Sequence, residues 1–197
     1  MFVGNLNLPQ DEGIAIGEAI VDGTCMGASD ESLVRTYMQI KGSQGFVISS
    51  EVKDQEIEGW GPAPASNNMS SLTTENYGLL GLLIVLHMIC KKFKINRDEY
   101  FDSVLVYIDN KTVVERGSME QTLINLSDYA VPEQGLWTLT TELIKALPIE
   151  VTVKWVKGQQ DKNSFGEKIM VHSNRTSNSI YELTNWQKKV CKQGKGK

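Results

Sequence analysis

The chain has 197 residues, of which 41% are hydrophobic and 22% are charged, and its formal net charge is −4. This length fits one domain with long loops, and the hydrophobic content can fill a sizeable core. The acidic balance excludes a generally basic surface as the means of attracting nucleic acid, so any basic patch has to be local.

The three cysteines, Cys25, Cys90 and Cys191, stand far apart, with no CxxC pair and no histidine at ligand spacing. This pattern argues against a disulfide framework or a zinc site and predicts reduced, intracellular thiols. The first residues lack the basic start of a signal peptide, and the longest apolar run, 79–90, is too short to span a membrane. We therefore expect a soluble intracellular protein with no membrane partner.

The N-terminal third contains three predicted strands. Residues 14–21 (IAIGEAIV) favour a strand that leads into the turn Asp22-Gly23-Thr24, and residues 45–52 (GFVISSEV) alternate like a second strand. A third strand is expected around Ile57–Trp60, before a Gly-Pro-Ala-Pro break. Residues 29–40 (SDESLVRTYMQI) are amphipathic and fit either a short helix or an extended loop.

The clearest helix covers residues 72–93, where leucines recur at helical spacing and Thr73 or Ser71 can cap the start. The later predicted elements are a strand at 103–108, a helix at 111–116, a loop at 117–132, a helix at 133–146, a strand at 149–156 and a helix from about 167 to 190. This order predicts an α/β fold, with a mixed sheet and helices packed on its faces.

Three acidic residues, Asp22, Glu75 and Asp109, stand where apolar segments meet polar turns or where the long helix begins. Carboxylates that meet near a core repel each other, and Mg²⁺ is the simplest remedy because it prefers hard oxygen ligands. Each residue also has a purely structural interpretation. Asp22 fits a turn, Glu75 suits the positive end of a helix dipole, and Asp109 fits an N-cap.

Four motifs carry a resemblance to a known family: DGT at 22–24, SSLTTENYGLL from Ser70, VYIDNKTVV from Val106 and VKWVKGQQD from Val153. In this order they resemble the ribonuclease H domain, and most closely the type attached to reverse transcriptases of retroelements. The resemblance indicates a ribonuclease H-like domain at residues 14–190. An N-terminal extension (1–13) would precede it and a basic, flexible tail (191–197) would follow it.

The resemblance implies a five-stranded mixed sheet flanked by helices, in which the first three strands are antiparallel and the last two run parallel to the first. It implies that Asp22, Glu75 and Asp109 meet at one edge of the sheet and hold two Mg²⁺ ions, with Mn²⁺ as a substitute. The implied activity is hydrolysis of the RNA strand of an RNA–DNA hybrid. A reverse transcriptase domain in the same polyprotein is an implied partner.

The sequence departs from the family pattern at two positions. Gln159 stands where the family has a loop histidine, and glutamine cannot shuttle protons near neutral pH. Asn178 stands at the position of a fourth metal-binding aspartate, which predicts weaker binding of one metal. Asp161 is an alternative metal ligand from the same region. His172 could compensate for the missing loop histidine, although an unrelated surface histidine is the preferred interpretation.

Contacts to nucleic acid are expected from polar residues near the carboxylates. The candidates are Ser70, Ser71, Thr74, Asn110, Lys157 and Gln159. Lys91, Lys92 and Lys94 fit either contacts to phosphate or a favourable interaction with the end of the long helix.

Three functional hypotheses remain open at this level. The leading one is a hybrid-specific endoribonuclease. The second is a degenerate domain that binds nucleic acid or serves as a structural module of a retroelement polyprotein. The third is a transposase or integrase core, which would need a late acidic residue such as Glu167 or Glu182.

Overall fold

A computed structural model describes residues 10–35, 40–50, 55–63, 69–96, 103–118 and 133–156. Its centre is a five-stranded sheet with the strand order β3-β2-β1-β4-β5. The strands are β1 (Cys25–Arg35), β2 (Ile40–Ser50), β3 (Gln55–Pro62), β4 (Ser103–Ile108) and β5 (Glu150–Trp155). β1, β2 and β3 pair antiparallel, whereas β4 is parallel to both β1 and β5. The predicted mixed sheet is confirmed.

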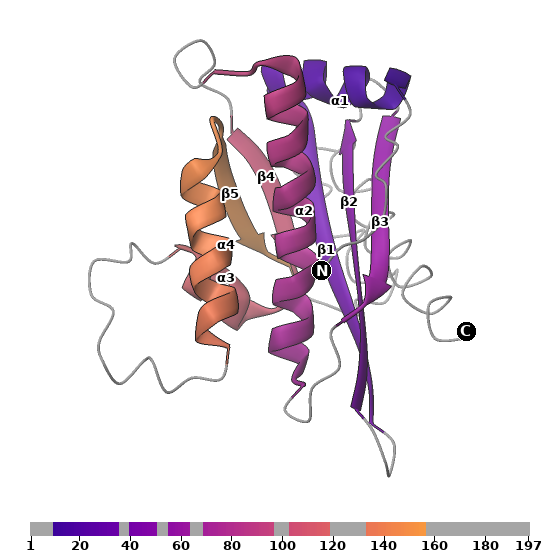
Figure 1. Cartoon of the computed structure of the whole chain (residues 1–197), viewed down its shortest axis with the longest axis vertical. Coiled ribbons are helices and arrows are strands. Elements are labelled where there is room, and N and C mark those ends of the chain that lie inside the picture. The colour runs from indigo at the N-terminus through magenta and orange to yellow at the C-terminus, as the bar shows by residue number, and fades with distance from the viewer. Residues whose placement is uncertain are drawn as a thin grey trace, which may run out of the picture.

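Helices in the described part of the chain cover one face of this sheet (Figure 1). They are α1 (Gln10–Val21), α2 (Ser71–Phe93), α3 (Lys111–Ser118) and α4 (Gln134–Ala146). Their buried side chains form one core with the inward residues of the strands, for example Ile48, Val106 and Ile108. The other face carries a smaller cluster of Met26, Ala28, Val47 and Tyr107.

α2 is the central helix of this layer. Ser70 is its N-cap and accepts the backbone N–H of Thr73 at 3.0 Å, so neither Thr73 nor Ser71 has the predicted capping role. The helix ends at Lys94, whose φ of 54° is left-handed. In the described part of the chain, α2 alone is long and apolar enough to cross a membrane, but 67% of its apolar window is buried in the protein.

The strand predicted at residues 14–21 is wrong, because these residues form α1. Ile16, Ala19 and Ile20 are buried and recur at helical spacing, while Gly17 lets the helix approach the ring of Phe93. The Asp-Gly-Thr turn that follows ends the helix. Gly23 has a φ of 72°, and Thr24 N–H donates to the carbonyl of Ala19.

Residues 29–40 were expected to form a short helix or an extended loop, but residues 25–35 form β1, the middle strand of the sheet. Its sequence, CMGASDESLVR, has few strong strand formers. Pairing with β2 on one side and β4 on the other stabilises it instead. The first strand therefore follows the Asp-Gly-Thr turn and does not precede it.

The other predicted elements agree with the structure where it describes them. The structure contains each of them, with ends shifted by a few residues: the second and third strands, the long helix, the strand at 103–108, the helices after it and the last strand. The predicted loop at 117–132 lies mostly outside the described residues, and its first two residues end α3. The predicted helix at 167–190 and the proposed tail also lie outside them, and the domain boundaries stay predictions.

Candidate functional site

β1 and β4 bring two aspartates to neighbouring positions in the middle of the sheet. The parallel register pairs Ser29 with Ile108, and the next residues are Asp30 on β1 and Asp109 after β4. Adjacent strands lie about 5 Å apart, so the backbones at Asp30 and Asp109 are close neighbours. The sequence analysis did not identify Asp30.

Glu75 comes to the same place from α2. Its side chain is 0% exposed, and its Oε1 accepts a hydrogen bond of 3.2 Å from the hydroxyl of Ser29, the residue before Asp30. One helical turn earlier, Ser71 donates its hydroxyl to Glu31. Because β1 and the start of α2 make two such contacts, Glu75 is held against the strand that carries Asp30.

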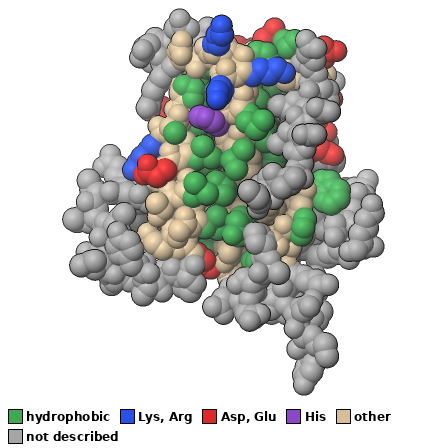
Figure 2. Space-filling view, in the orientation of Figure 1, with side chains coloured by type: hydrophobic (Ala, Val, Ile, Leu, Met, Phe, Trp, Pro, Cys, Tyr) green, Lys and Arg blue, Asp and Glu red, His purple; other side chains and the backbone are tan. Residues whose placement is uncertain are grey.

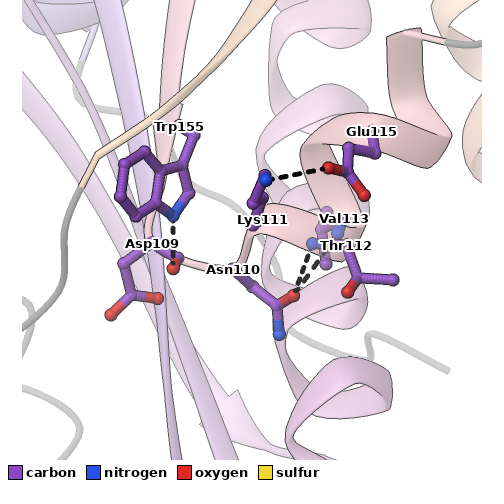
Figure 3. Close-up of polar contacts among 7 residues, drawn as sticks. All are labelled: Asp109, Asn110, Lys111, Thr112, Val113, Glu115 and Trp155. Carbon is purple, nitrogen blue, oxygen red and sulfur yellow. Dashed lines mark hydrogen bonds and ion pairs between the residues drawn. The ribbon is translucent and has the colours of Figure 1, made fainter.

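Asp109 follows the last residue of β4, and only Asn110 separates it from α3 (Figure 3). Its backbone carbonyl accepts the indole N–H of Trp155 from β5 at 3.0 Å. The cap of α3 is made by the next residue, since Asn110 Oδ1 accepts the N–H groups of Thr112 at 3.1 Å and Val113 at 3.4 Å. Asn110, and not Asp109, therefore has the predicted N-cap role.

The predicted convergence of Asp22 with Glu75 and Asp109 is wrong. Asp22 lines a shallow cavity of about 440 Å³ with Phe93 and Lys94, at the C-terminal end of α2. Glu75 is in the second turn of that helix, 18 residues before Phe93, which corresponds to about 27 Å along the axis. The Asp22 carboxylate accepts the N–H of Thr24 at 3.2 Å, which is the turn role that was the alternative.

The carboxylates with described side chains do not form a complete metal site. Among these residues, no group of three or more His, Cys, Asp or Glu side chains is arranged to hold a metal ion. Glu75 and Asp109 are hard oxygen donors of the kind that Mg²⁺ prefers, and the backbone register adds Asp30 beside them. With the Asp30 carboxylate as a third ligand beside Glu75 and Asp109, these donors fit a divalent metal.

Predicted contacts to nucleic acid have mixed outcomes. Thr74 is 0% exposed and donates to the carbonyl of Ser70, so it cannot contact nucleic acid. Ser70 donates to Glu133 at 2.8 Å, and the exposed Ser71 binds Glu31. Two further candidates for nucleic-acid contacts, Lys157 and Gln159, lie outside the described residues. The predicted metal ligands Asp161 and Asn178 lie outside them as well.

The basic cluster Lys91, Lys92 and Lys94 is exposed at the C-terminal end of α2, where Figure 2 shows the blue side chains. This end of the helix is remote from Glu75. A favourable interaction with the helix dipole therefore explains Lys91 and Lys92 without a ligand.

Comparison with known proteins rests on structure, because no family model and no curated protein matches the sequence. The chain is similar to the foamy viral protease-reverse transcriptase in complex with dsDNA, with 13% identity and a TM-score of 0.55. That match covers 89% of this chain and 96% of the other. It is also similar to LC11-RNase H1, isolated from compost, with 13% identity, a TM-score of 0.51 and coverage of 84% and 95%.

The chain has the ribonuclease H fold. The number and the directions of the strands agree with the expectation from the resemblance, and at 13% identity the likeness establishes the fold alone. Within this fold the backbone of Asp30, and not that of Asp22, lies beside Asp109, and Glu75 contacts Ser29, the residue before Asp30. The DGT match lies outside the sheet, before β1.

Proposed function

We propose that this chain is a metal-dependent endoribonuclease that hydrolyses the RNA strand of RNA–DNA hybrids, with Asp30, Glu75 and Asp109 as its carboxylate core. One observation carries the proposal. β1 ends its pairing with β4 at Ser29, so Asp30 neighbours Asp109, and the same Ser29 binds Glu75. The backbone of Asp30, the end of β4 at Asp109 and the Glu75 turn of α2 are thus neighbours in a fold shared with ribonuclease H structures.

The chemistry of these groups suits two Mg²⁺ ions, with Mn²⁺ as a substitute. Bound metal would activate water and stabilise the leaving oxygen of the phosphodiester. The part of the protein is to hold the ligands. Ser29 fixes the direction of the Glu75 carboxylate, while Trp155 and Asn110 fix the backbone on each side of the Asp109 side chain.

The departures at Gln159 and Asn178 bear on how active this site is. An asparagine at a fourth ligand position offers an oxygen without a charge, which weakens the affinity for one of the two metals. Restoring the charge with Asn178→Asp should therefore lower the Mg²⁺ concentration needed for half-maximal cleavage. If Asp161 is the ligand instead, Asp161→Asn should raise that concentration and Asn178→Asp should leave it unchanged.

The biological setting is part of the proposal. The similarity to a viral protease-reverse transcriptase supports a retroelement-type domain that works beside a reverse transcriptase in one polyprotein. A reverse transcriptase produces RNA–DNA hybrids, so the proposed substrate would arise next to this domain, inside the cell.

The experiment is hydrolysis of an RNA–DNA hybrid labelled on the RNA strand, in Mg²⁺, in Mn²⁺ and in EDTA. We expect cleavage of the hybrid RNA with either metal, none in EDTA, and none of single-stranded RNA or duplex DNA. Asp109→Asn should lower the rate on the order of 1,000-fold, because it removes a metal ligand. Glu115→Gln is the control, since Glu115 is exposed on α3 and pairs with Lys111.

Failure in this assay has two distinguishable forms. If the hybrid binds the protein but stays intact in both metals, the domain is the degenerate nucleic-acid-binding module. If Asp109→Asn cleaves as fast as the unchanged protein, the activity comes from another site or from a contaminant.

A further inference from the structure

The start of α2 is bonded to α4 through the carboxylate of Glu133. Glu133 precedes α4 directly, and its Oε1 accepts the hydroxyls of Ser70, at 2.8 Å, and of Thr73. Ser70 is itself the N-cap of α2. The charge thus lies at the beginnings of two helices, where the helix dipoles favour a negative group.

A second contact joins the same two helices one to two turns further on. The hydroxyl of Thr140 on α4 lies 3.0 Å from Oδ1 of Asn76 on α2 and 2.9 Å from the carbonyl of Leu136 within α4, and its one proton is shared between these two acceptors. Asn76 is 0% exposed and Thr140 is 1% exposed, so this polar pair is inside the protein. Ser70 contacts Glu133 where both helices begin, and Asn76 contacts Thr140 further along both. The two helices therefore run parallel, side by side (Figure 1).

These two contacts flank Glu75 in the sequence of α2. Ser70 and Thr73 precede it, and Asn76 follows it directly. Apolar residues of α4 also face the main core, where Trp137 is buried and Leu143 packs against it. Apolar packing tolerates sliding and rotation, whereas a buried hydrogen bond specifies one register.

We propose that α4 positions Glu75, with Thr140 and Glu133 as positioning residues. Ser29 holds the Glu75 carboxylate from the sheet, and α4 sets the rotation and height of the turn that carries it. This inference rests on the proposed function, because Glu75 is a metal ligand there. Its consequence is that changes on α4, which offers no ligand, alter the affinity of the site for metal.

The test compares two adjacent threonines of α4. Thr140→Val removes the hydroxyl that binds Asn76, whereas Thr141→Val removes a hydroxyl that binds the carbonyl of Trp137 within α4. We expect Thr140→Val to raise the Mg²⁺ concentration for half-maximal hybrid cleavage about 10-fold. This is the low end of the effects seen for residues that bond a metal ligand, because Thr140 acts on Glu75 through Asn76. Thr141→Val should leave this concentration unchanged, and Thr140→Ser, which keeps the hydroxyl, should restore it.

Direct Mn²⁺ binding, followed by electron paramagnetic resonance of the free ion, is the second readout and needs no catalysis. If the unchanged protein binds Mn²⁺ but does not cleave, the proposed function fails while the positioning is still tested. Weaker Mn²⁺ binding by Thr140→Val than by Thr141→Val supports it, and equal binding overturns it. Absence of any Mn²⁺ binding by the unchanged protein overturns both.

Glu133→Gln provides a second variant in case Thr140→Val does not fold. Glutamine keeps the shape but weakens acceptance of the Ser70 and Thr73 hydroxyls, and Glu133 lies near the surface. Its control is Glu142→Gln, on the same helix, where Glu142 is exposed and pairs with Lys145. A loss of Mn²⁺ affinity in Glu133→Gln alone supports positioning by α4, and equal affinities in the two variants contradict it.

Discussion

Ser29 gives the site its most specific contact at the scale of single residues. It is 2% exposed, and its hydroxyl donates to a glutamate that is itself fully buried. A buried carboxylate is costly unless donors and cations satisfy it, so this hydroxyl stabilises Glu75 where the proposed metals bind. The hydrogen bond to Glu75 therefore explains the serine at position 29.

Ser29→Ala should raise the Mg²⁺ concentration for half-maximal hybrid cleavage about 10- to 100-fold, because partners of metal ligands have effects of this size. Ser49→Ala, at a buried serine of β2, is the matched change elsewhere in the sheet and should have no such effect. Equal Mg²⁺ dependence in the two variants would show that the Ser29 hydroxyl does not support the site.

The close approach of α2 to β2 is the critical packing contact at the scale of elements. Gly42 lies against Thr74, and a Cβ at position 42 would be 2.8 Å from the Thr74 hydroxyl and 3.2 Å from Cβ of Ala63. Thr74 is β-branched, fully buried and bonded to Ser70, so it cannot move aside easily. The residue after Thr74 is Glu75.

Gly42→Ala should therefore lower the free energy of unfolding by about 1–3 kcal/mol, as overpacking of a core does. Gly61→Ala on β3 is the control, because a Cβ there meets no atom within 4 Å. Urea unfolding of both variants measures the difference. A Gly42→Ala protein as stable as Gly61→Ala would mean that the α2–β2 contact is looser than the structure shows.

Elements with strong periodic patterns were predictable from the sequence, and the first strand was not. The leucine spacing in α2 predicts a helix, and the SVLVYI run in β4 predicts a buried strand. β1 contains Gly27, Ser29, Asp30 and Glu31, and pairing on both sides makes it a strand against weak propensity. The segment 14–21 has the apolar content of a strand but buries it with helical spacing.

The error in the carboxylate set follows from the error in the strand. Placing the first strand at 14–21 made Asp22 the acid at its end, and the DGT motif supported this choice. One signal was available, because 23 residues separate 14–21 from 45–52, whereas antiparallel neighbours are usually joined by two to five residues. A short hairpin requires the strand just before β2, and that strand contains Asp30.

At the scale of the whole molecule, two buried thiols, Cys25 in β1 and Cys90 in α2, make stability depend on pH. Burial, together with the nearby charges of Cys90 and Asp22, raises the pKa of Cys25 far above its ordinary range. Burial also raises the pKa of Cys90, from about 9 to about 11. Both thiols stay protonated in the folded protein at a pH where the unfolded chain has begun to ionise.

The stabilisation from these protonated thiols is complete below pH 9. It is lost as the pH rises toward 11 for Cys90 and over a still higher range for Cys25, whose pKa is raised further. We expect the free energy of unfolding to fall over this range by roughly 1 kcal/mol per pH unit for each thiol. Cys90→Ala lacks one of the two groups and should show a shallower fall, whatever its stability at pH 8. Urea unfolding at several pH values, with reductant present, checks the slope. Parallel slopes for the two proteins would contradict the pKa assignment.

The whole account depends on Asp30 being the first carboxylate of the site. Hybrid cleavage by Asp30→Asn and Asp22→Asn, measured side by side in Mg²⁺, tests this most directly, because both changes remove one charge from neighbouring segments. We predict that Asp30→Asn loses activity on the order of 1,000-fold, while Asp22→Asn cleaves like the unchanged protein. Loss of cleavage in Asp22→Asn with full activity in Asp30→Asn would contradict the account.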